Sequence, residues 1–95
     1  MTVIRGTLID LERKGPDFVS LARLRVVHDE GEQEVALPLF AKAGRDYVGR
    51  FVEVGNSLGQ VPGMFGQTII SMNGEGSAAI SMPEERYRAL LREYF

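Results

Sequence analysis

The sequence predicts a mainly β protein: a small five-stranded barrel with a short connector helix and a C-terminal amphipathic helix. Two observations predict the barrel. Residues 35–40 and 51–54 each follow the period-two alternation that is typical of half-buried strands. The connector between them is too short for a parallel crossover helix, so we expect it to plug the open end of a barrel. In that position Tyr47 and Val48 turn inward and Gly49 ends the turn.

The length and composition indicate one soluble domain. The chain has 95 residues, of which 44% are hydrophobic and 25% charged, which is enough for one core and too little for two. We expect a barrel over about residues 2–72, a linker over 73–80 and a helix over 81–95. No apolar run approaches the ~18 residues of a membrane helix, and the N-terminus does not read as a secretory signal. We therefore expect no membrane association. The absence of cysteine makes a cytoplasmic location the expectation.

The charge pattern limits the class of partner. A net charge of -2 argues against coating duplex DNA by bulk electrostatics, but it allows a local basic face. Nine of the eleven basic residues are arginine, which suits phosphate binding and base stacking better than lysine does. Compositional bias of the source genome is the alternative explanation.

The first two strands are expected over residues 2–11 and 18–27. Gly6 lies inside the first strand, where a glycine marks a bulge or a sharp bend, and this strand has to coil to serve both halves of the barrel wall. A Gly-Pro-Asp turn separates the two strands. In the second strand Arg23 and Arg25 share the outward face with Val19 and Leu21. The inward residues of that strand are Phe18, Ala22, Leu24 and Val26.

Two loops frame the rest of the barrel. Residues 28–34 form a charged hairpin loop whose four carboxylates lack the spacing of a calcium loop, so a solvated turn is expected. Residues 55–66 hold four glycines and a proline and read as a long loop, in which Phe65 is either a buried anchor or an exposed contact. The fifth strand is expected over residues 67–72.

The C-terminal segment reads as an amphipathic helix over residues 81–95. Ser81 and Glu84 match a capping box, and Pro83 is tolerated in the first turn. Either this helix packs on its own barrel, or it faces a protein partner or a second copy of the chain. The apolar stripe of the helix is formed by Tyr87, Leu90, Leu91 and Tyr94.

No catalytic constellation is found. Residues 55–59 match the G-x-S-x-G nucleophile elbow, but a glycine-rich loop rather than a helix follows, and the only histidine is His28 in the charged turn. One histidine and no cysteine make a zinc site unfavourable. We therefore predict a protein that is not an enzyme and needs no cofactor or metal.

Three segments, V-x-R-G-x-L, SLARLRVV and EVALPLFAKAGRDYVGRFVEVGNSLG, together resemble the bacterial single-stranded-DNA-binding proteins. The resemblance covers about residues 3–72 and consists mainly of apolar positions and glycines. It implies the OB fold, a five-stranded barrel, and binding of single-stranded nucleic acid. A shorter likeness, GNSLGQVP and GSAAISMPEE, resembles the opening of swapped-hairpin regulator domains. Neither copy is followed by the helix and strands that those domains require.

The first functional hypothesis is therefore an OB-like protein that binds single-stranded nucleic acid on the outward faces of its second and third strands. Arg23 and Arg25 would contact phosphates, and Lys42 belongs to the same candidate site. The candidate stacking residues are Phe40, Phe51 and Phe65, of which Phe40 and Phe51 could equally belong to the core.

The second hypothesis is an OB-type protein-interaction module or assembly subunit that uses residues 81–95 and the glycine-rich loop. Under this hypothesis the chain is expected to be a homo-oligomer or to bind a protein partner. Solvent accessibility separates the two hypotheses. Three or more aromatic rings clustered with arginines on one barrel face favour nucleic acid, whereas exposure of the apolar helix stripe favours protein.

Overall fold

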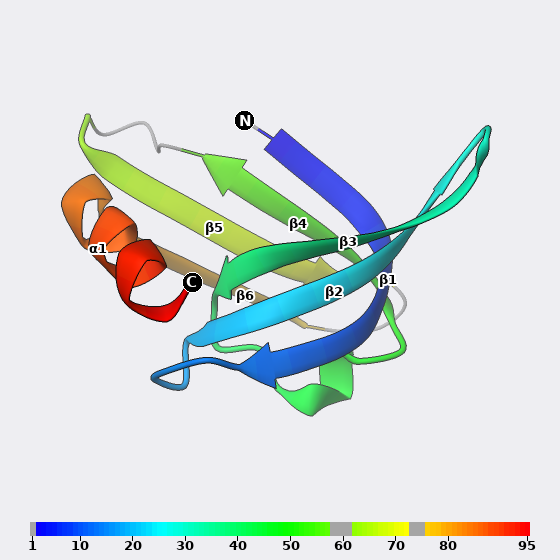
Figure 1. The fold of residues 1–95 in the computed structure, drawn as a ribbon, viewed down its shortest axis with the longest axis horizontal. Helices are drawn as coiled ribbons and strands as arrows, with labels where there is room; N and C mark the ends of the chain where they lie inside the picture. Colours follow the sequence, from blue (N-terminus) through cyan, green and yellow to red (C-terminus); the bar gives the residue numbers. More distant parts are fainter. Residues whose placement is uncertain (1, 58–61, 73–75) are drawn as a thin grey trace.

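The computed structural model of the chain describes residues 2–57, 62–72 and 76–95. Its six antiparallel strands form one open sheet in the order β3-β2-β1-β4-β5-β6, and one helix follows at the C-terminus (Figure 1). The mainly β class with a C-terminal helix is thus confirmed. The elements are β1 (Thr2–Arg13), β2 (Val19–His28), β3 (Gly31–Phe40), the 3-10 helix η1 (Arg45–Tyr47), β4 (Phe51–Ser57), β5 (Met64–Ser71), β6 (Ser77–Pro83) and α1 (Glu84–Tyr94).

The first strand serves two neighbours, as the glycine inside it predicted. β1 pairs with β4 from Thr2 to Thr7 and with β2 from Thr7 to Arg13, and its register with β2 shifts just after Leu8. At Gly6 the backbones come so close that a Cβ atom would lie 2.5 Å from the carbonyl oxygen of Arg25. Only glycine fits this close approach, which lets β1 bend from one half of the sheet to the other.

The connector between β3 and β4 closes one end of the curved sheet. Tyr47 is buried there, and Gly49 has a positive φ of 89°, as expected for the residue that ends the turn. Two backbone hydrogen bonds fasten the connector to β1: Gly49 N–H donates to the Leu8 carbonyl (2.7 Å), and Leu8 N–H donates to the Arg50 carbonyl (2.9 Å). The predicted plug is therefore present, as one turn of 3-10 helix.

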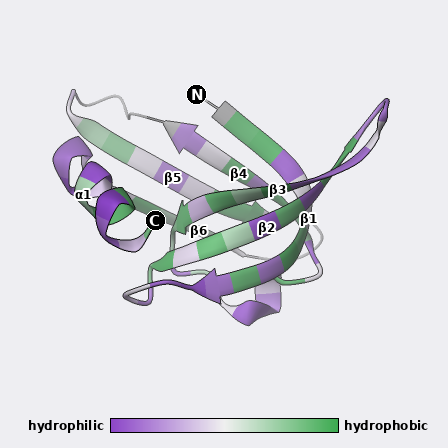
Figure 2. Ribbon diagram, in the orientation of Figure 1, coloured by the Kyte–Doolittle hydropathy of each residue, from purple (hydrophilic) through white to green (hydrophobic). Residues whose placement is uncertain are grey.

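The main core lies inside the curved sheet, where alternate residues of the strands meet. The hairpin between β2 and β3 projects away from this core and is hydrophilic (Figure 2). The buried core residues are Leu8, Leu11, Ala22, Leu24, Leu37, Leu39, Ala41, Tyr47, Val52, Val54 and Ile69.

The closed five-stranded barrel is not what the sheet forms. β3 and β5 approach each other, but the pairing of the sheet ends at β3 on one side and at β6 on the other. The buried side chain of Gln67 on β5 bridges this approach: its Nε2 donates to the Pro38 carbonyl (2.9 Å), and its Oε1 accepts from the Phe40 N–H. A single side chain thus takes the place of a backbone ladder between β3 and β5.

Where the structure describes them, the linker predicted over residues 73–80 is partly a strand, and the helix predicted from residue 81 begins at Glu84. Residues 73–75 lie outside the described residues, but Ser77 begins β6, which pairs with β5 up to Pro83. Small residues such as Ala78 and Ala79 have a low β propensity, so the strand was not visible as a pattern; it forms because β5 presents an edge to pair with. Ser81 is therefore a strand residue, and α1 starts after Pro83 without a side-chain cap. The N–H of Glu84 donates to the Gly63 carbonyl instead (2.7 Å).

The apolar stripe of α1 packs on the chain's own sheet. Leu90 is buried, and Tyr87 stacks on the Phe65 ring with centroids 3.6 Å apart and meets Phe40 edge-on at 5.2 Å. Val19 and Met82 complete this second cluster between the end of β2 and the β5–β6 pair. The described part of the chain contains no helix long and apolar enough to cross a membrane.

Candidate nucleic-acid interface

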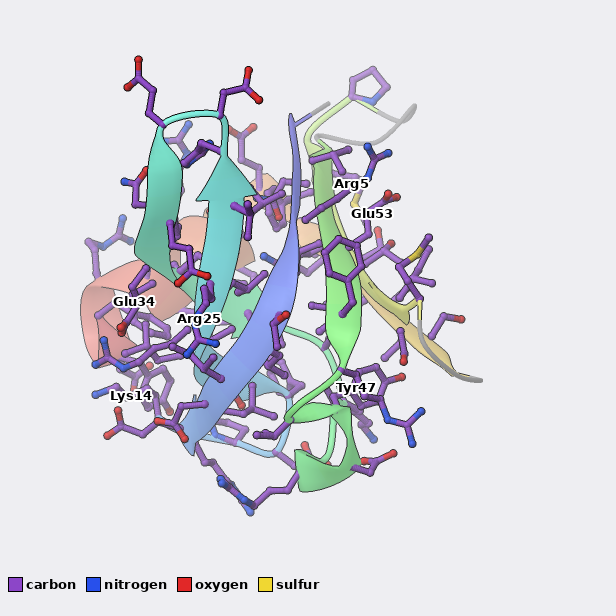
Figure 3. The ribbon with its side chains drawn as sticks, turned by 90° about the vertical axis from the view of Figure 1, so that its right-hand side faces the viewer. Arg5, Lys14, Arg25, Glu34, Tyr47 and Glu53 are labelled. Atoms are coloured by element: carbon purple, nitrogen blue, oxygen red, sulfur yellow. The ribbon has the colours of Figure 1, made fainter. Side chains whose placement is uncertain are left out.

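The two arginines predicted to face outward do so from β2. Arg23 and Arg25 lie on the same face, and each has a carboxylate of β3 beside it: Arg23 Nη1 is 3.7 Å from Glu34 Oε1, and Arg25 Nε is 3.8 Å from Glu32 Oε2. Figure 3 shows this face with Arg25 and Glu34 over the β2–β3 side and Arg5 and Glu53 over β1 and β4. A phosphate that binds here has to displace surface carboxylates.

Two of the three predicted stacking residues belong to the core. Phe40 is 0% exposed and Phe65 is 6% exposed, and both contact Tyr87 under α1. The alternation of β3 places Phe40 on the outward face, but α1 covers that end of the sheet. Neither ring is therefore available to stack on a base, and the prediction is corrected for these two residues.

Phe51 is the predicted aromatic residue that reaches the surface. It is 39% exposed at the start of β4. In the sheet register Thr7 of β1 pairs with Phe51 on one side and with Arg25 on the other. Phe51 and Arg25 therefore lie on one cross-strand row of the same face, about 10 Å apart, or two strand spacings. Next to Phe51, Ile70 and Met72 are also exposed.

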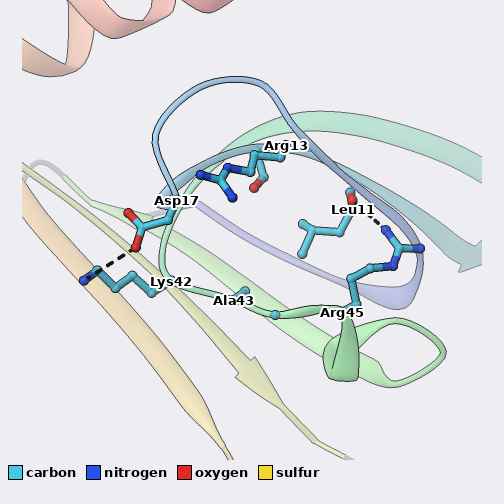
Figure 4. Close-up of a pocket in the computed structure, with 8 residues that line it drawn as sticks. Leu11, Arg13, Asp17, Lys42, Ala43 and Arg45 are labelled. Atoms are coloured by element: carbon cyan, nitrogen blue, oxygen red, sulfur yellow. Dashed lines mark hydrogen bonds and ion pairs between the residues drawn. The ribbon is translucent and has the colours of Figure 1, made fainter.

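A cleft of about 500 Å³ opens between the β1–β2 turn and the β3–β4 connector (Figure 4). Lys42, a predicted site residue, lines it with its Nζ 3.8 Å from Asp17 Oδ2. Two arginines that the sequence analysis did not single out line it as well. Arg13 Nε donates to the Gly15 carbonyl (3.2 Å), and Arg45 Nη1 donates to the Leu11 carbonyl (3.1 Å).

Asp10 connects the arginines of β2 with this cleft. Its Cα pairs with that of Arg23 in the β1–β2 register, and its Oδ1 is 3.9 Å from Arg45 Nη2. The face of β2 and the cleft therefore adjoin each other. We refer to the cations that run from this face into the cleft as the cationic track: Arg25, Arg23, Arg45, Arg13 and Lys42.

The track is close to electrically balanced. Its five cations are interleaved with four carboxylates, from Glu32, Glu34, Asp10 and Asp17, at nitrogen–oxygen distances of 3.7 to 3.9 Å. Ion pairs of this exposed kind contribute ~0 to 1 kcal/mol each, so a polyanion can exchange with the carboxylates at little loss. The track is thus suited to a moderate, salt-dependent affinity for phosphates.

Only the local positions of Arg13 and Arg45 in the sequence pointed to them as site residues. Arg45 follows Lys42 by three residues in the connector, and Arg13 ends β1 just before the turn at Gly15. Arg13 lies beyond the predicted end of the first strand and Arg45 lies in the connector, so strand alternation assigned neither of them to a face. Only the folding of the turn against the connector brings these two arginines to one cleft.

Other candidate chemistry receives no support from the described residues. Among them there is no group of three or more His, Asp or Glu residues that could hold a metal ion. Ser57 of the G-x-S-x-G match is the last residue of β4, and the match ends outside the part of the chain that the structure describes.

The comparisons with known proteins give no relative. No family model, no curated protein and no solved structure matches this chain.

Proposed function

We propose that this protein binds single-stranded nucleic acid along the cationic track. Arg23 and Arg25 sit two residues apart on one strand face, so their side chains emerge about 7 Å apart, a spacing that resembles successive phosphates of an extended strand. A nucleotide whose phosphate lies on Arg25 can present its base towards Phe51 on the same cross-strand row. Base stacking on such a ring is tolerant of sequence.

The observation that carries the proposal is the junction at Asp10. It joins Arg23 to Arg45, and through Arg45 to the cleft that also holds Arg13 and Lys42. A path of several consecutive cations is what an extended polyanion needs, whereas a small anionic ligand needs only one cluster.

We also propose that the sheet is an OB barrel in modified form. The order β3-β2-β1-β4-β5, with β1 shared between both halves, is the strand arrangement expected of that fold, and it agrees with the resemblance of residues 3–72 to bacterial single-stranded-DNA-binding proteins. In this variant Gln67 replaces the β3–β5 ladder, and β6 and α1 extend the barrel.

The first test is a titration of labelled oligo-dT with the full chain at low and high salt. Replacing both Arg23 and Arg25 by alanine is expected to weaken binding. It should also make the salt dependence shallower by about 0.7 in log–log slope per lost phosphate contact. The reciprocal variant Glu32→Gln/Glu34→Gln keeps both arginines, removes the competing carboxylates and is expected to tighten binding.

The matched control for this titration is Arg88→Ala/Arg92→Ala, which removes the same charge from the exposed face of α1. It is expected to change affinity little. The proposal fails if the wild type has no measurable affinity for oligo-dT at low salt. It also fails if the α1 control weakens binding as much as the β2 variant.

The second test concerns Phe51 and separates stacking from packing. Phe51→Ala should weaken oligo-dT binding by ~1 to 3 kcal/mol, because the stacked base loses its partner, with little change in salt slope because no charge is removed. Ile70→Ala is the control: Ile70 lies on the adjacent strand β5 and is about as exposed as Phe51, and its replacement removes an apolar group without removing a ring. Equal losses for both variants would contradict a stacking role for Phe51.

A further inference from the structure

The strand β6 forms one edge of the open sheet, next to β5 (Figure 1). Two backbone hydrogen bonds fix which of its residues face β5. The N–H of Ser71 donates to the Gly76 carbonyl (3.0 Å), and the N–H of Glu84 donates to the Gly63 carbonyl (2.7 Å). Since antiparallel hydrogen bonding alternates with a period of two, the even-numbered residues of β6 bond to β5. The residues whose N–H and C=O groups point to the free edge are therefore Ser77, Ala79 and Ser81.

This edge carries no charge, bulge or interior proline, three of the features that normally prevent strands from pairing. Residues 54–83 contain one charged residue, Glu75, in a chain that is 25% charged. Neither β5 nor β6 contains any charge, and the exposed side chains of β6 are small. Natural edge strands are usually protected by charges, bulges or an interior proline, whereas the proline of β6 is its last residue.

The opposite edge of the sheet, β3, is protected. Pro38 has no N–H, its carbonyl accepts from Gln67, and the Phe40 N–H donates to the same side chain. The other half of β3 carries Glu32 and Glu34. A strand of another molecule can therefore pair with β6 but not with β3, so β6 cannot pair head-to-tail with β3 of the next copy to build a fibre.

We propose that β6 pairs antiparallel with β6 of a second copy, which makes the chain a two-fold symmetric dimer with a continuous sheet. A two-fold axis at Ala79 places Ala79 opposite its counterpart. It also places Ser77 of each copy opposite Ser81 of the other, so three pairs form. Each of these three pairs exchanges two hydrogen bonds, so every outward N–H and C=O group of these residues is satisfied. Ser77, Ala79 and Ser81, the residues that pair across the axis, carry no charge and have small side chains, which makes this edge complementary to itself. This interface is separate from residues 84–94, whose apolar stripe packs inside the chain.

The first experiment is sedimentation of the full chain over a range of concentrations. The wild type should show a monomer–dimer equilibrium, and Ala79→Pro should raise its dissociation constant roughly 5- to 150-fold, because it removes two of six hydrogen bonds. The fold should survive, since the N–H of Ala79 does not bond to β5. Ala36→Pro is the matched control: it changes an exposed outward alanine of β3 and should leave the dimer intact. Circular dichroism and the melting temperature check the fold of both variants.

The second experiment uses the absence of cysteine from the chain. Facing residues of a hydrogen-bonded pair have Cα atoms about 5.5 Å apart, within the range of a disulfide. Mild oxidation of Ala79→Cys should therefore cross-link nearly all of the protein as a covalent dimer, whereas Ala36→Cys should form little covalent dimer.

A wild type that sediments as a monomer at every concentration overturns the proposal and leaves the edge to an extended segment of a different protein. A dimer that is unaffected by Ala79→Pro, together with equal cross-linking of the two cysteine variants, overturns it as well.

Discussion

Replacing Phe40 by alanine is expected to lower the free energy of unfolding by about 3–5 kcal/mol, the range for a large side chain removed from a packed core. The ring is fully buried and meets the rings of Tyr87 and Phe95 edge-on, with centroids 5.2 and 6.2 Å apart. It joins the end of β3 to α1, so a cavity at this point weakens the attachment of the helix as well as the sheet. Equilibrium unfolding in urea, followed by circular dichroism, measures the change.

Phe51→Ala is the matched control for this experiment, because it makes the same chemical change at a residue that is 39% exposed. We expect it to destabilise the protein by less than about 1.5 kcal/mol, since part of the ring is already in water. Equal losses of stability for Phe40→Ala and Phe51→Ala would show that the cluster under α1 is not packed as described. The comparison also separates the predicted stacking residue from the core residue by stability alone.

Replacing Gln67 by leucine is expected to destabilise the protein by about 2–6 kcal/mol, because two backbone groups lose their partner, although leucine has nearly the same volume and is more apolar. The substitution leaves the Phe40 N–H and the Pro38 carbonyl without their partner, and a buried group left unsatisfied costs ~1 to 3 kcal/mol. Hydrogen exchange gives a local measurement: the amide of Phe40 should exchange faster in the variant than in the wild type.

Gln33→Leu provides the control for this substitution. Gln33 is exposed on the same strand β3, and its Oε1 lies 3.1 Å from His28 Nε2. The same chemical change at that site should alter stability by less than about 0.5 kcal/mol. If Gln67→Leu were as stable as the wild type, the approach of β3 to β5 would not depend on this side chain.

The candidate site was predictable in part. The alternation of β2 placed Arg23 and Arg25 on the outer face, because successive side chains of any β-strand point to opposite faces. The same reasoning placed Phe40 on that face, where the ring is nevertheless buried, because burial also depends on what packs over the strand. Lys42 was identified without its neighbours, since Arg13 is distant in the sequence and meets it only across the cleft.

The sequence by itself determined the presence of the first four strands, the bend at Gly6 and the turn at Gly49, although β3 begins at Gly31, inside the segment predicted as a loop. These features follow from local rules, namely side-chain periodicity and the backbone freedom of glycine, and they need no knowledge of distant residues. The tertiary structure alone decided three further features: the strand β6, the covering of Phe40 and Phe65 by α1, and the bridging of β3 and β5 by Gln67. The bridge made by Gln67 and the covering by α1 bring Phe40 together with segments far along the chain, whereas β6 pairs with the strand just before it. β6 is a strand because β5 offers it a partner, and Gln67 is buried because two backbone groups of β3 satisfy its amide.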